Sequence, residues 1–285
     1  MSAAQPERRA APRMRDDSFP MRGWGLPEDG EMDRVVIVSP HLDDAVLGCA
    51  RLMAAHPGVT VVTVFAGNPP AYPEPMRTWD VQSGFGPDDD VMEARRREDR
   101  AALALLDATP VHLGFVEHTY NPGDHTVRRE TIADGLVAAL RGLVPTLVLV
   151  PFGLANPDHD VTHRACMLAR DRLEPTVSWG CYEESEAPET PGPVSWWLYE
   201  DFGYKSIPGM LAWRIASLFR NKLWPTPVIP PTDADDRRKL EAIACYPSQL
   251  LALEDDWQIG AKLGAPEQFW RIAPPPEGWD GLTID

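Results

Sequence analysis

Apolar stretches of strand length alternate along the first two-thirds of the chain with segments whose apolar positions recur at helical spacing. The apolar runs are bounded by Pro, Gly or charged residues and predict strands over residues 34–39, 59–65, 111–115, 145–151 and 177–182. The amphipathic segments predict helices over residues 45–56, 91–107, 128–142 and 160–172. Such alternation implies right-handed crossovers, so we expect a Rossmann-like α/β fold, a three-layer sandwich with a mostly parallel sheet.

Two regions depart from this alternation. Residues 67–90 are rich in Pro, Gly and Asp and too long for an ordinary connection, which favours a lid or a binding wall. From residue 183 onward the chain is rich in Pro and Trp, and we expect residues 183–285 to form a C-terminal cap that carries much of the substrate wall. Residues 1–30 predict a flexible N-terminal arm, and residues 31–285 predict a single domain.

The composition is that of a folded globular protein, with 44% of the 285 residues hydrophobic and 25% charged. The net charge of −16 argues against a nucleic-acid backbone or an anionic membrane surface as partner. The longest apolar runs, such as residues 146–152, are far shorter than the roughly 20 residues that span a bilayer, and no secretory signal is evident. Four widely spaced cysteines predict reduced thiols, so we expect a cytoplasmic protein.

Polar side chains gather where the first and fourth predicted strands end. In the stretch VVIVSPHLDDAVLGC, His41, Asp43 and Asp44 come directly after a β-branched run that is typical of a strand buried on both faces. The segment GLANPDHDVTHRA follows the fourth strand and contains further acidic and imidazole side chains, including His159. Ligands of open α/β sheets bind outside the carboxyl ends of the strands, so we expect the two clusters to converge.

Neutral imidazoles and carboxylates are suitable ligands for Zn²⁺, and a catalytic zinc keeps three protein ligands and an open position. One His and one Asp from the first cluster and one His from the second would complete such a set, which also accepts another divalent metal such as iron or cobalt. No G-x-G-x-x-G follows the first strand, so a dinucleotide site is not expected. A nucleotide-sugar transferase is disfavoured because a glycine loop that would cradle phosphates is lacking.

The stretch SPHLDDAVLG resembles the histidine-proline-x-aspartate-aspartate motif of the PIG-L or LmbE-like family of zinc-dependent N-deacetylases. The later NPDHDVTH is similar to the histidine-proline-aspartate-histidine segment of that family. Four further stretches also fit the family: VTVFAGNPP, RRREDRAALALL, LGFVEHTY and KLEAIACYPSQL. The resemblance covers roughly residues 34–252 and implies zinc-dependent removal of acetyl groups from amino sugars.

The resemblance implies that His41, Asp44 and His159 bind the zinc and that Asp43 is the general base. Zinc lowers the pKa of a bound water toward about 7, so a single carboxylate base would suffice to make hydroxide for attack on an acetamide. Asp158 is implied to orient a neighbouring imidazole.

The chain departs from the family motifs at two positions. Ala45 stands where relatives usually have a glutamate, and Asn156 stands where they usually have the histidine implicated in oxyanion stabilisation or proton donation. An asparagine donates hydrogen bonds but does not transfer a proton at pH 7. The resemblance therefore implies oxyanion assistance by Asn156, but not an acid role.

Three other residues are candidates for the site. The resemblance implies that Arg95 contacts sugar hydroxyls or a phosphate. Glu117 stands where relatives often present an aspartate to the sugar, with a surface-loop acid as the alternative interpretation. His163 lies four residues after His159, on the same helical face, and is either a further ligand or proton donor, or a structural residue one turn into the helix.

The sequence thus predicts a zinc-dependent hydrolase that removes acetate from a small-molecule N-acetylated amino sugar, N-acetylglucosaminide-like, or from its conjugate. An amidase acting on a thiol-sugar conjugate is one alternative, because the same chemistry serves both substrates. A catalytically idle sugar-binding module is another, which Asn156 and Ala45 favour and the retained Asp43 opposes.

Overall fold

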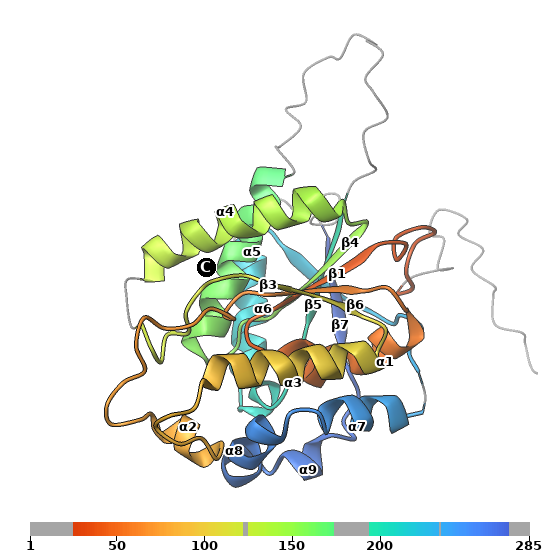
Figure 1. Cartoon of the computed structure of the whole chain (residues 1–285). Helices are drawn as coiled ribbons and strands as arrows, with labels where there is room; N and C mark the ends of the chain where they lie inside the picture. Colours follow the sequence, from red (N-terminus) through yellow and green to blue (C-terminus); the bar gives the residue numbers. More distant parts are fainter. Residues whose placement is uncertain (1–24, 122–124, 174–193, 234, 274–285) are drawn as a thin grey trace, which may run out of the picture.

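The structure is a computed structural model that describes residues 25–121, 125–173, 194–233 and 235–273. In this part of the chain, seven strands form one sheet in the order β3-β2-β1-β4-β5-β7-β6 (Figure 1). The strands are β1 (Val35–Ser39), β2 (Thr60–Thr63), β3 (Thr109–His112), β4 (Leu147–Pro151), β5 (Ser195–Tyr199), β6 (Trp224–Val228) and β7 (Phe269–Ala273). The helices are α1 (Asp44–Ala55), α2 (Thr78–Gln82), α3 (Val91–Leu105), α4 (His125–Leu143), α5 (Pro157–Leu173), α6 (Met210–Arg220), α7 (Arg237–Ile243), α8 (Pro247–Trp257) and α9 (Ile259–Lys262), with a 3-10 turn η1 (Tyr204–Ser206).

The first five strands of the sheet are parallel. β1 pairs with β2 and β4, β2 pairs with β3, and β4 pairs with β5, whereas β7 runs antiparallel to both β5 and β6. The chain extends the sheet from β1 through β2 to β3, then returns and adds β4 on the other side of β1. This reversal makes the carboxyl ends of β1 and β4 the switch point where ligands of such sheets bind.

Each face of the sheet packs against helices through its own apolar core. Along β1, Ile37 belongs to the core under α1, α3 and α7, whereas Val36 and Val38 belong to the core under α4, α5 and α6. This division follows from the alternation of side chains along a strand. Figure 1 shows the two groups of helices on opposite sides of the sheet. The predicted three-layer α/β fold is therefore confirmed.

Four of the five predicted strands correspond to β1, β2, β3 and β4. The four predicted helices correspond to α1, α3, α4 and α5. The fifth predicted strand, residues 177–182, lies outside the described residues. The strand that follows β4 in the sheet is instead β5, whose sequence SWWLY is assigned above to the cap. β5, β6 and β7 all extend the main sheet, so a separate C-terminal cap is not confirmed.

The predicted N-terminal arm falls mostly on residues 1–24, which lie outside the described residues. Among the helices that the structure describes, none combines the length and apolar character needed to cross a membrane.

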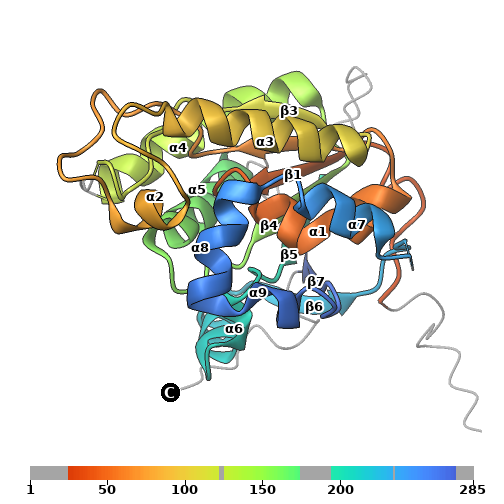
Figure 2. The same cartoon turned by 60° about the horizontal axis from the view of Figure 1, so that its bottom comes forward.

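Residues 67–90 contain the short helix α2, and their predicted role as a binding wall is consistent with its position. Figure 2 shows α2 beside α8, and the two helices contact each other. The indole Nε1 of Trp79 in α2 donates to the side-chain oxygen of Gln249 in α8 (3.3 Å). This contact joins the two helices at the carboxyl edge of the sheet.

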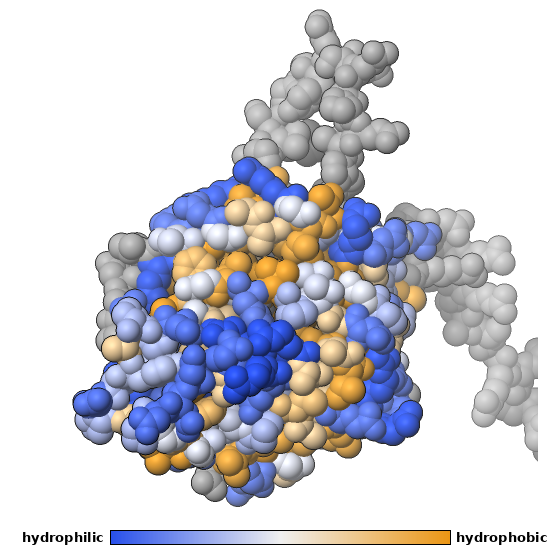
Figure 3. All heavy atoms as spheres, in the orientation of Figure 1, coloured by the Kyte–Doolittle hydropathy of each residue, from blue (hydrophilic) through white to orange (hydrophobic). Residues whose placement is uncertain are grey.

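Helix α3 presents a charged face to solvent, visible as the hydrophilic patch at the centre of Figure 3. There Glu93 accepts hydrogen bonds from Arg96 and Arg100. Arg95 and Asp99 lie on the opposite side of the helix and are buried. Among the arginines of this helix, Arg95 is therefore the one directed into the protein.

Candidate active site

The turn between β1 and α1 positions the first cluster of polar side chains. The hydroxyl of Ser39 donates to the carbonyl of His41 (2.7 Å) and accepts from the backbone N–H of Ala45 (3.0 Å). Asp44 begins α1, and its Oδ2 atom accepts from the backbone N–H of His41 (2.9 Å). Asp43 precedes the helix, but its side chain makes no capping hydrogen bond. The Asp43 carboxylate is therefore not used to stabilise the helix end, and it lines a cavity.

The first turn of α5 positions the second cluster. The side-chain oxygen of Asn156 accepts from the backbone N–H of Asp158 (2.8 Å), as capping side chains do at helix starts. Pro157 opens the helix, where a missing N–H costs no intrahelical hydrogen bond. Asp158 and His159 follow and are both buried. Both side chains are thereby held inside the protein at the carboxyl end of β4.

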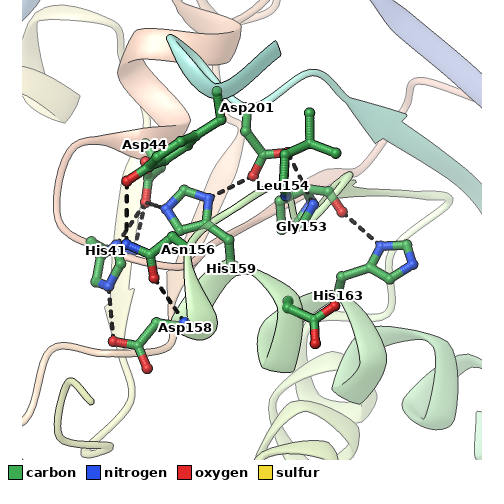
Figure 4. A network of polar contacts seen from close by, with 12 residues as sticks. His41, Asp44, Gly153, Leu154, Asn156, Asp158, His159, His163 and Asp201 are labelled. Atoms are coloured by element: carbon green, nitrogen blue, oxygen red, sulfur yellow. Dashed lines mark hydrogen bonds and ion pairs between the residues drawn. The ribbon is translucent and has the colours of Figure 1, made fainter. Parts of the chain in front are cut away.

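His41, Asp44 and His159 form a group that could hold a metal ion (Figure 4). Their candidate ligand atoms all lie within 4.8 Å of one another. The Oδ2 atom of Asp44 is 3.1 Å from Nδ1 of His41 and 3.2 Å from Nε2 of His159. One carboxylate and two imidazoles provide three ligands and leave coordination positions open, as in catalytic zinc sites. The structure thus brings together the three residues that the family resemblance implied as ligands.

The charges around this group favour a cation. Burial opposes protonation of His41, but Asp158 and Asp44 raise its pKa well above the usual value. Burial also opposes protonation of His159, but the charge of Asp44 and the hydrogen bond with Asp201 raise its pKa to about 9. Although burial acts in the opposite direction, His159 and His41 hold the pKa of Asp44 well below its usual range. Carboxylates that favour positive charge on both imidazoles also favour a bound metal cation.

The carboxylates of Asp158 and Asp201 contact the imidazole nitrogens that do not face Asp44. The Oδ2 atom of Asp158 lies 3.3 Å from Nε2 of His41, and the Oδ1 atom of Asp201 lies 2.6 Å from Nδ1 of His159. Each imidazole therefore directs its other nitrogen at Asp44. Carboxylates in this position fix the orientation of metal-binding histidines and make them better ligands.

The family resemblance implied this role for Asp158, whereas no sequence motif pointed to Asp201. Asp201 follows β5, just as His41 follows β1, so it obeys the rule that polar residues at the carboxyl ends of parallel strands form the site. It is missed because the aromatic run SWWLY is assigned to a cap rather than to a strand. An interpretation of SWWLYED as a buried strand followed by acids would have found it.

Asp43 lies beside the metal group and is not one of its three members. The residue is only 9% exposed. Burial and the neighbouring charge of Asp44 raise the pKa of Asp43 to about 7. A carboxyl with such a pKa can accept a proton and return it at neutral pH.

These groups line one cavity of about 240 Å³. Its lining includes the metal group, Asp43, Asp158 and the buried Arg95. Four apolar side chains also line it: Leu47, Trp79, Phe202 and Leu253. The cavity thus combines reactive polar groups with apolar surface that a larger substrate group could contact.

Arg95 is the arginine of this lining and is 3% exposed. Its two terminal nitrogens donate to Glu117 (3.1 Å) and Asp80 (3.2 Å). The hydroxyl of Tyr120 donates to the same oxygen of Asp80 (2.7 Å). The structure therefore brings the two sequence-predicted residues Arg95 and Glu117 together in the cavity. Two carboxylates balance the charge of this arginine, which weakens its attraction for a phosphate.

Tyr204 lines the cavity beside His159, and no motif of the sequence analysis includes it. The two rings meet edge-on with 5.0 Å between their centroids. The Tyr204 hydroxyl accepts a hydrogen bond from the side-chain nitrogen of Asn156 (3.2 Å). Burial raises the pKa of Tyr204, and the charges of Asp44 and His41 also act on it. The hydroxyl thus lies within electrostatic reach of the metal group.

His163 lies apart from the metal group. Its Nδ1 donates to the carbonyl of Pro151 (2.9 Å), and Figure 4 shows its ring well separated from His41 and Asp44. Burial and the charge of Arg214 lower the pKa of His163 to about 4, so the ring is neutral at pH 7. The structure favours the structural interpretation of this residue over the ligand interpretation.

Comparison with known proteins finds deacetylases. Residues 36–170 match the family model described as PIG-L, GlcNAc-PI de-N-acetylase. One similar solved structure is the A40926 pseudoaglycone deacetylase, at 25% identity and a TM-score of 0.62, covering 85% of this chain and 97% of that one. Another is a triple mutant of a deacetylase of the teicoplanin biosynthetic pathway, at 25% identity and a TM-score of 0.65, covering 86% and 99%. No sequence among the curated proteins matches the chain.

Proposed function

Because residues 36–170 form a domain of the PIG-L family, we propose that this protein is an N-deacetylase that hydrolyses the acetamide of an N-acetylated amino sugar within a larger conjugate. One observation carries the proposal: a single cavity holds both the His-Asp-His group and the buried carboxyl of Asp43, whose pKa is about 7. The likeness of most of the chain to two solved deacetylases supports the same reaction. The products would be acetate and a free amine.

His41, Asp44 and His159 would hold a divalent cation, and zinc is the metal we propose. The cation would polarise the acetamide carbonyl and lower the pKa of a water molecule, which an unreactive amide requires for hydrolysis at neutral pH. The same three ligands also suit iron or cobalt, so metal analysis of the purified protein decides among them.

Asp43 is the proposed general base. It accepts a proton from water while the water oxygen bonds to the carbonyl carbon and the π electrons of the carbonyl move onto its oxygen. When the carbon–nitrogen bond breaks, its electron pair stays on the nitrogen, and the proton held by Asp43 passes to that nitrogen. One water molecule is consumed for each amide cleaved. A pKa of about 7 suits a group that must both take and return a proton.

Asp158 and Asn156 are proposed to position other groups. Asp158 contacts Nε2 of His41, which directs Nδ1 of the same ring toward Asp44. Asn156 bonds to the first turn of α5 with its oxygen and to Tyr204 with its nitrogen. Both contacts hold the Asn156 amide beside the metal group, where we propose that it assists the oxyanion.

The charge of the cavity favours a sugar without anionic groups. Five carboxylates line it against a single arginine, so negative charge remains in surplus even with a divalent cation bound. Arg95 and Glu117 are proposed to contact sugar hydroxyls. The apolar surface that includes Trp79 and Leu253 is proposed to contact the group attached to the sugar.

Acetate release tests the proposal directly. The purified protein would be incubated with uncharged N-acetylglucosaminides whose attached groups increase in size, and acetate and free amine would be quantified. We expect equal amounts of both products and faster turnover as the attached group becomes larger and more apolar. Release of no acetate from any of these substrates would contradict the proposal, and cleavage of a thiol-sugar conjugate alone would favour the amidase alternative.

A further inference from the structure

Asp80 of helix α2 lines the cavity, although no motif of the sequence analysis includes it. It belongs to residues 67–90 and is only 2% exposed. The residue before it, Trp79, bonds to Gln249 of α8, the helix that lies beside α2 in Figure 2. Asp80 itself contacts the buried Arg95. Helix α2 is therefore anchored through two neighbouring side chains, and one of them is a carboxylate directed into the protein.

The two oxygens of the Asp80 carboxylate are used unequally. Oδ1 accepts hydrogen bonds from Nη2 of Arg95 (3.2 Å) and from the hydroxyl of Tyr120 (2.7 Å). Oδ2 accepts none from the residues that the structure describes, and it does not belong to their buried side-chain atoms that lack a partner. Arginine and carboxylate groups frequently pair through both oxygens, which this pair does not do. Oδ2 therefore stays accessible to a ligand in the cavity that Asp80 lines.

Glu117 contacts the same arginine in the same way. Its Oε1 accepts from Nη1 of Arg95 (3.1 Å), whereas its Oε2 accepts no hydrogen bond from the described part of the chain. The Nε of Arg95 has no partner there either, but it is buried and not accessible to a ligand. One guanidinium thus holds two carboxylates side by side, and each presents a second oxygen. These two oxygens can only accept hydrogen bonds.

We infer, on the basis of the proposed deacetylation, that Asp80 is a specificity-determining residue whose Oδ2 accepts a hydrogen bond from one hydroxyl of the sugar. A carboxylate oxygen in a cavity costs free energy when a bound ligand shields it from water without supplying a donor. A site of this kind rejects an analogue that lacks the hydroxyl more strongly than an apolar site would. The inference adds a contact from α2 to those proposed for Arg95 and Glu117.

A buried acid with a purely structural role offers a direct comparison. Asp99 of α3 is also 2% exposed, but it does not line the cavity. Its Oδ2 lies 2.7 Å from Nε2 of His112, and its Oδ1 accepts from the hydroxyl of Tyr246 (2.9 Å). Both oxygens of Asp99 are thus used within the protein. The accessible second oxygen distinguishes Asp80 from this acid, and Asp99→Asn is the matched control for Asp80→Asn.

Substrates that each lack one hydroxyl test the inference in the wild-type protein. An uncharged N-acetylglucosaminide and its monodeoxy analogues would be compared by kcat/KM for acetate release. We expect removal of the hydroxyl that Asp80 contacts to lower kcat/KM by about 10- to 100-fold, the contribution of a hydrogen bond to a charged group.

The substitution Asp80→Asn assigns the affected hydroxyl. The amide oxygen can keep the bonds from Arg95 and Tyr120, while the amide nitrogen replaces Oδ2 and removes the charged acceptor. We expect kcat/KM for the complete substrate to fall by the same factor, so that the ratio between it and one deoxy analogue falls toward one. The ratios for the other analogues and the metal content should not change. Asp99→Asn should preserve every ratio. Asp80→Ser provides the same comparison with a shorter side chain.

The outcomes separate this inference from the proposed function. Absence of acetate release from every substrate would overturn both. Acetate release with equal kcat/KM for the complete substrate and all its deoxy analogues would overturn the inference and leave the deacetylase proposal standing. Ratios that stay the same in Asp80→Asn and Asp80→Ser, even with lower overall activity, would assign Asp80 a structural role and also overturn the inference. Loss of the preference for one hydroxyl in the Asp80 variants, but not in Asp99→Asn, supports it.

Discussion

The Oδ1 atom of Asp201 lies 2.6 Å from Nδ1 of His159. A carboxylate can only accept, so Nδ1 carries a proton, and Nε2 is the nitrogen that gives its lone pair to a metal when the ring is neutral. That nitrogen faces Asp44 at 3.2 Å. The other oxygen of Asp201 accepts from the backbone N–H of Gly153 (2.9 Å), which ties the carboxylate to the end of β4. Asp201 therefore fixes both the tautomer and the direction of one proposed metal ligand.

Substitution of Asp201 by Asn should weaken metal binding. The amide would no longer complement the positive charge that His159 develops as a ligand, and we expect the affinity for zinc to fall by about 10- to 100-fold. Competition with a chelator of known affinity measures this change. Glu200→Gln is the control, because Glu200 is the adjacent buried acid and bonds to Trp270 instead. Equal zinc affinity in the wild-type protein and Asp201→Asn would contradict the assignment.

Asp201 is missed because the aromatic run before it is interpreted as part of a cap and not as a strand of the sheet. The runs that form β1 and β4 are continuous and apolar. The polar motifs that follow them therefore indicate the carboxyl edge of the sheet from local sequence alone. On the side away from β1, β4 pairs with β5, with Pro151 opposite Tyr199, although these two strands are separated by more than forty residues of sequence. Only this pairing brings Asp201 and Tyr204 to the site.

The same limit applies to the end of the chain. Pro- and Trp-rich sequence favours a cap, but Trp197 and Tyr199 are buried in the sheet, where large aromatic side chains fill the space under α1 and α7. β7 lies between β5 and β6 and runs antiparallel to both. The local sequence pattern of these strands does not indicate this pairing. The metal group was predictable because its members lie within short motifs, whereas the supporting residues come from strand pairing.

Substitution of Asp43 by Asn should suppress turnover without loss of metal. The amide is similar in size but cannot accept a proton, and general-base catalysis contributes about 10²- to 10⁴-fold to the rate. Steady-state acetate release and metal content of the same preparation measure both quantities. Turnover equal to that of the wild-type protein would rule Asp43 out as the base, and loss of metal would show instead that it supports the ligands.

Phosphorylated substrates should be poor ones. Like charges placed together cost several kcal/mol, so we expect kcat/KM for an N-acetylglucosaminide with a phosphate on its sugar to be at least about tenfold below that of the uncharged one. Glu117→Gln should reduce this difference, because it leaves Arg95 with a single carboxylate partner, Asp80. Glu93→Gln on the outer face of α3 is the control. Equal use of both substrates by the wild-type protein would contradict this view of the cavity.

Protonation of the buried His163 ring should destabilise the folded protein in acid. Its pKa is about 4 in the folded protein against a usual value of 6.5, so the unfolded chain binds the proton more readily. The neutral ring of His163 makes its full contribution to the free energy of unfolding above pH 6.5. This contribution, about 3 kcal/mol in all, is lost as the pH falls toward 4. His163→Gln keeps a donor for the carbonyl of Pro151 but does not titrate. Its unfolding free energy, measured with denaturant, should therefore fall less steeply over this range; parallel curves would contradict the prediction.

Metal dependence is tested by measuring metal content together with acetate release, before and after chelation and after zinc is added back. We expect one metal ion per chain, held by His41, Asp44 and His159, with acetate release that stops on chelation and returns with the metal. A protein that binds no metal even after zinc is supplied, or that releases acetate equally well without it, would rule out a metal-dependent deacetylase.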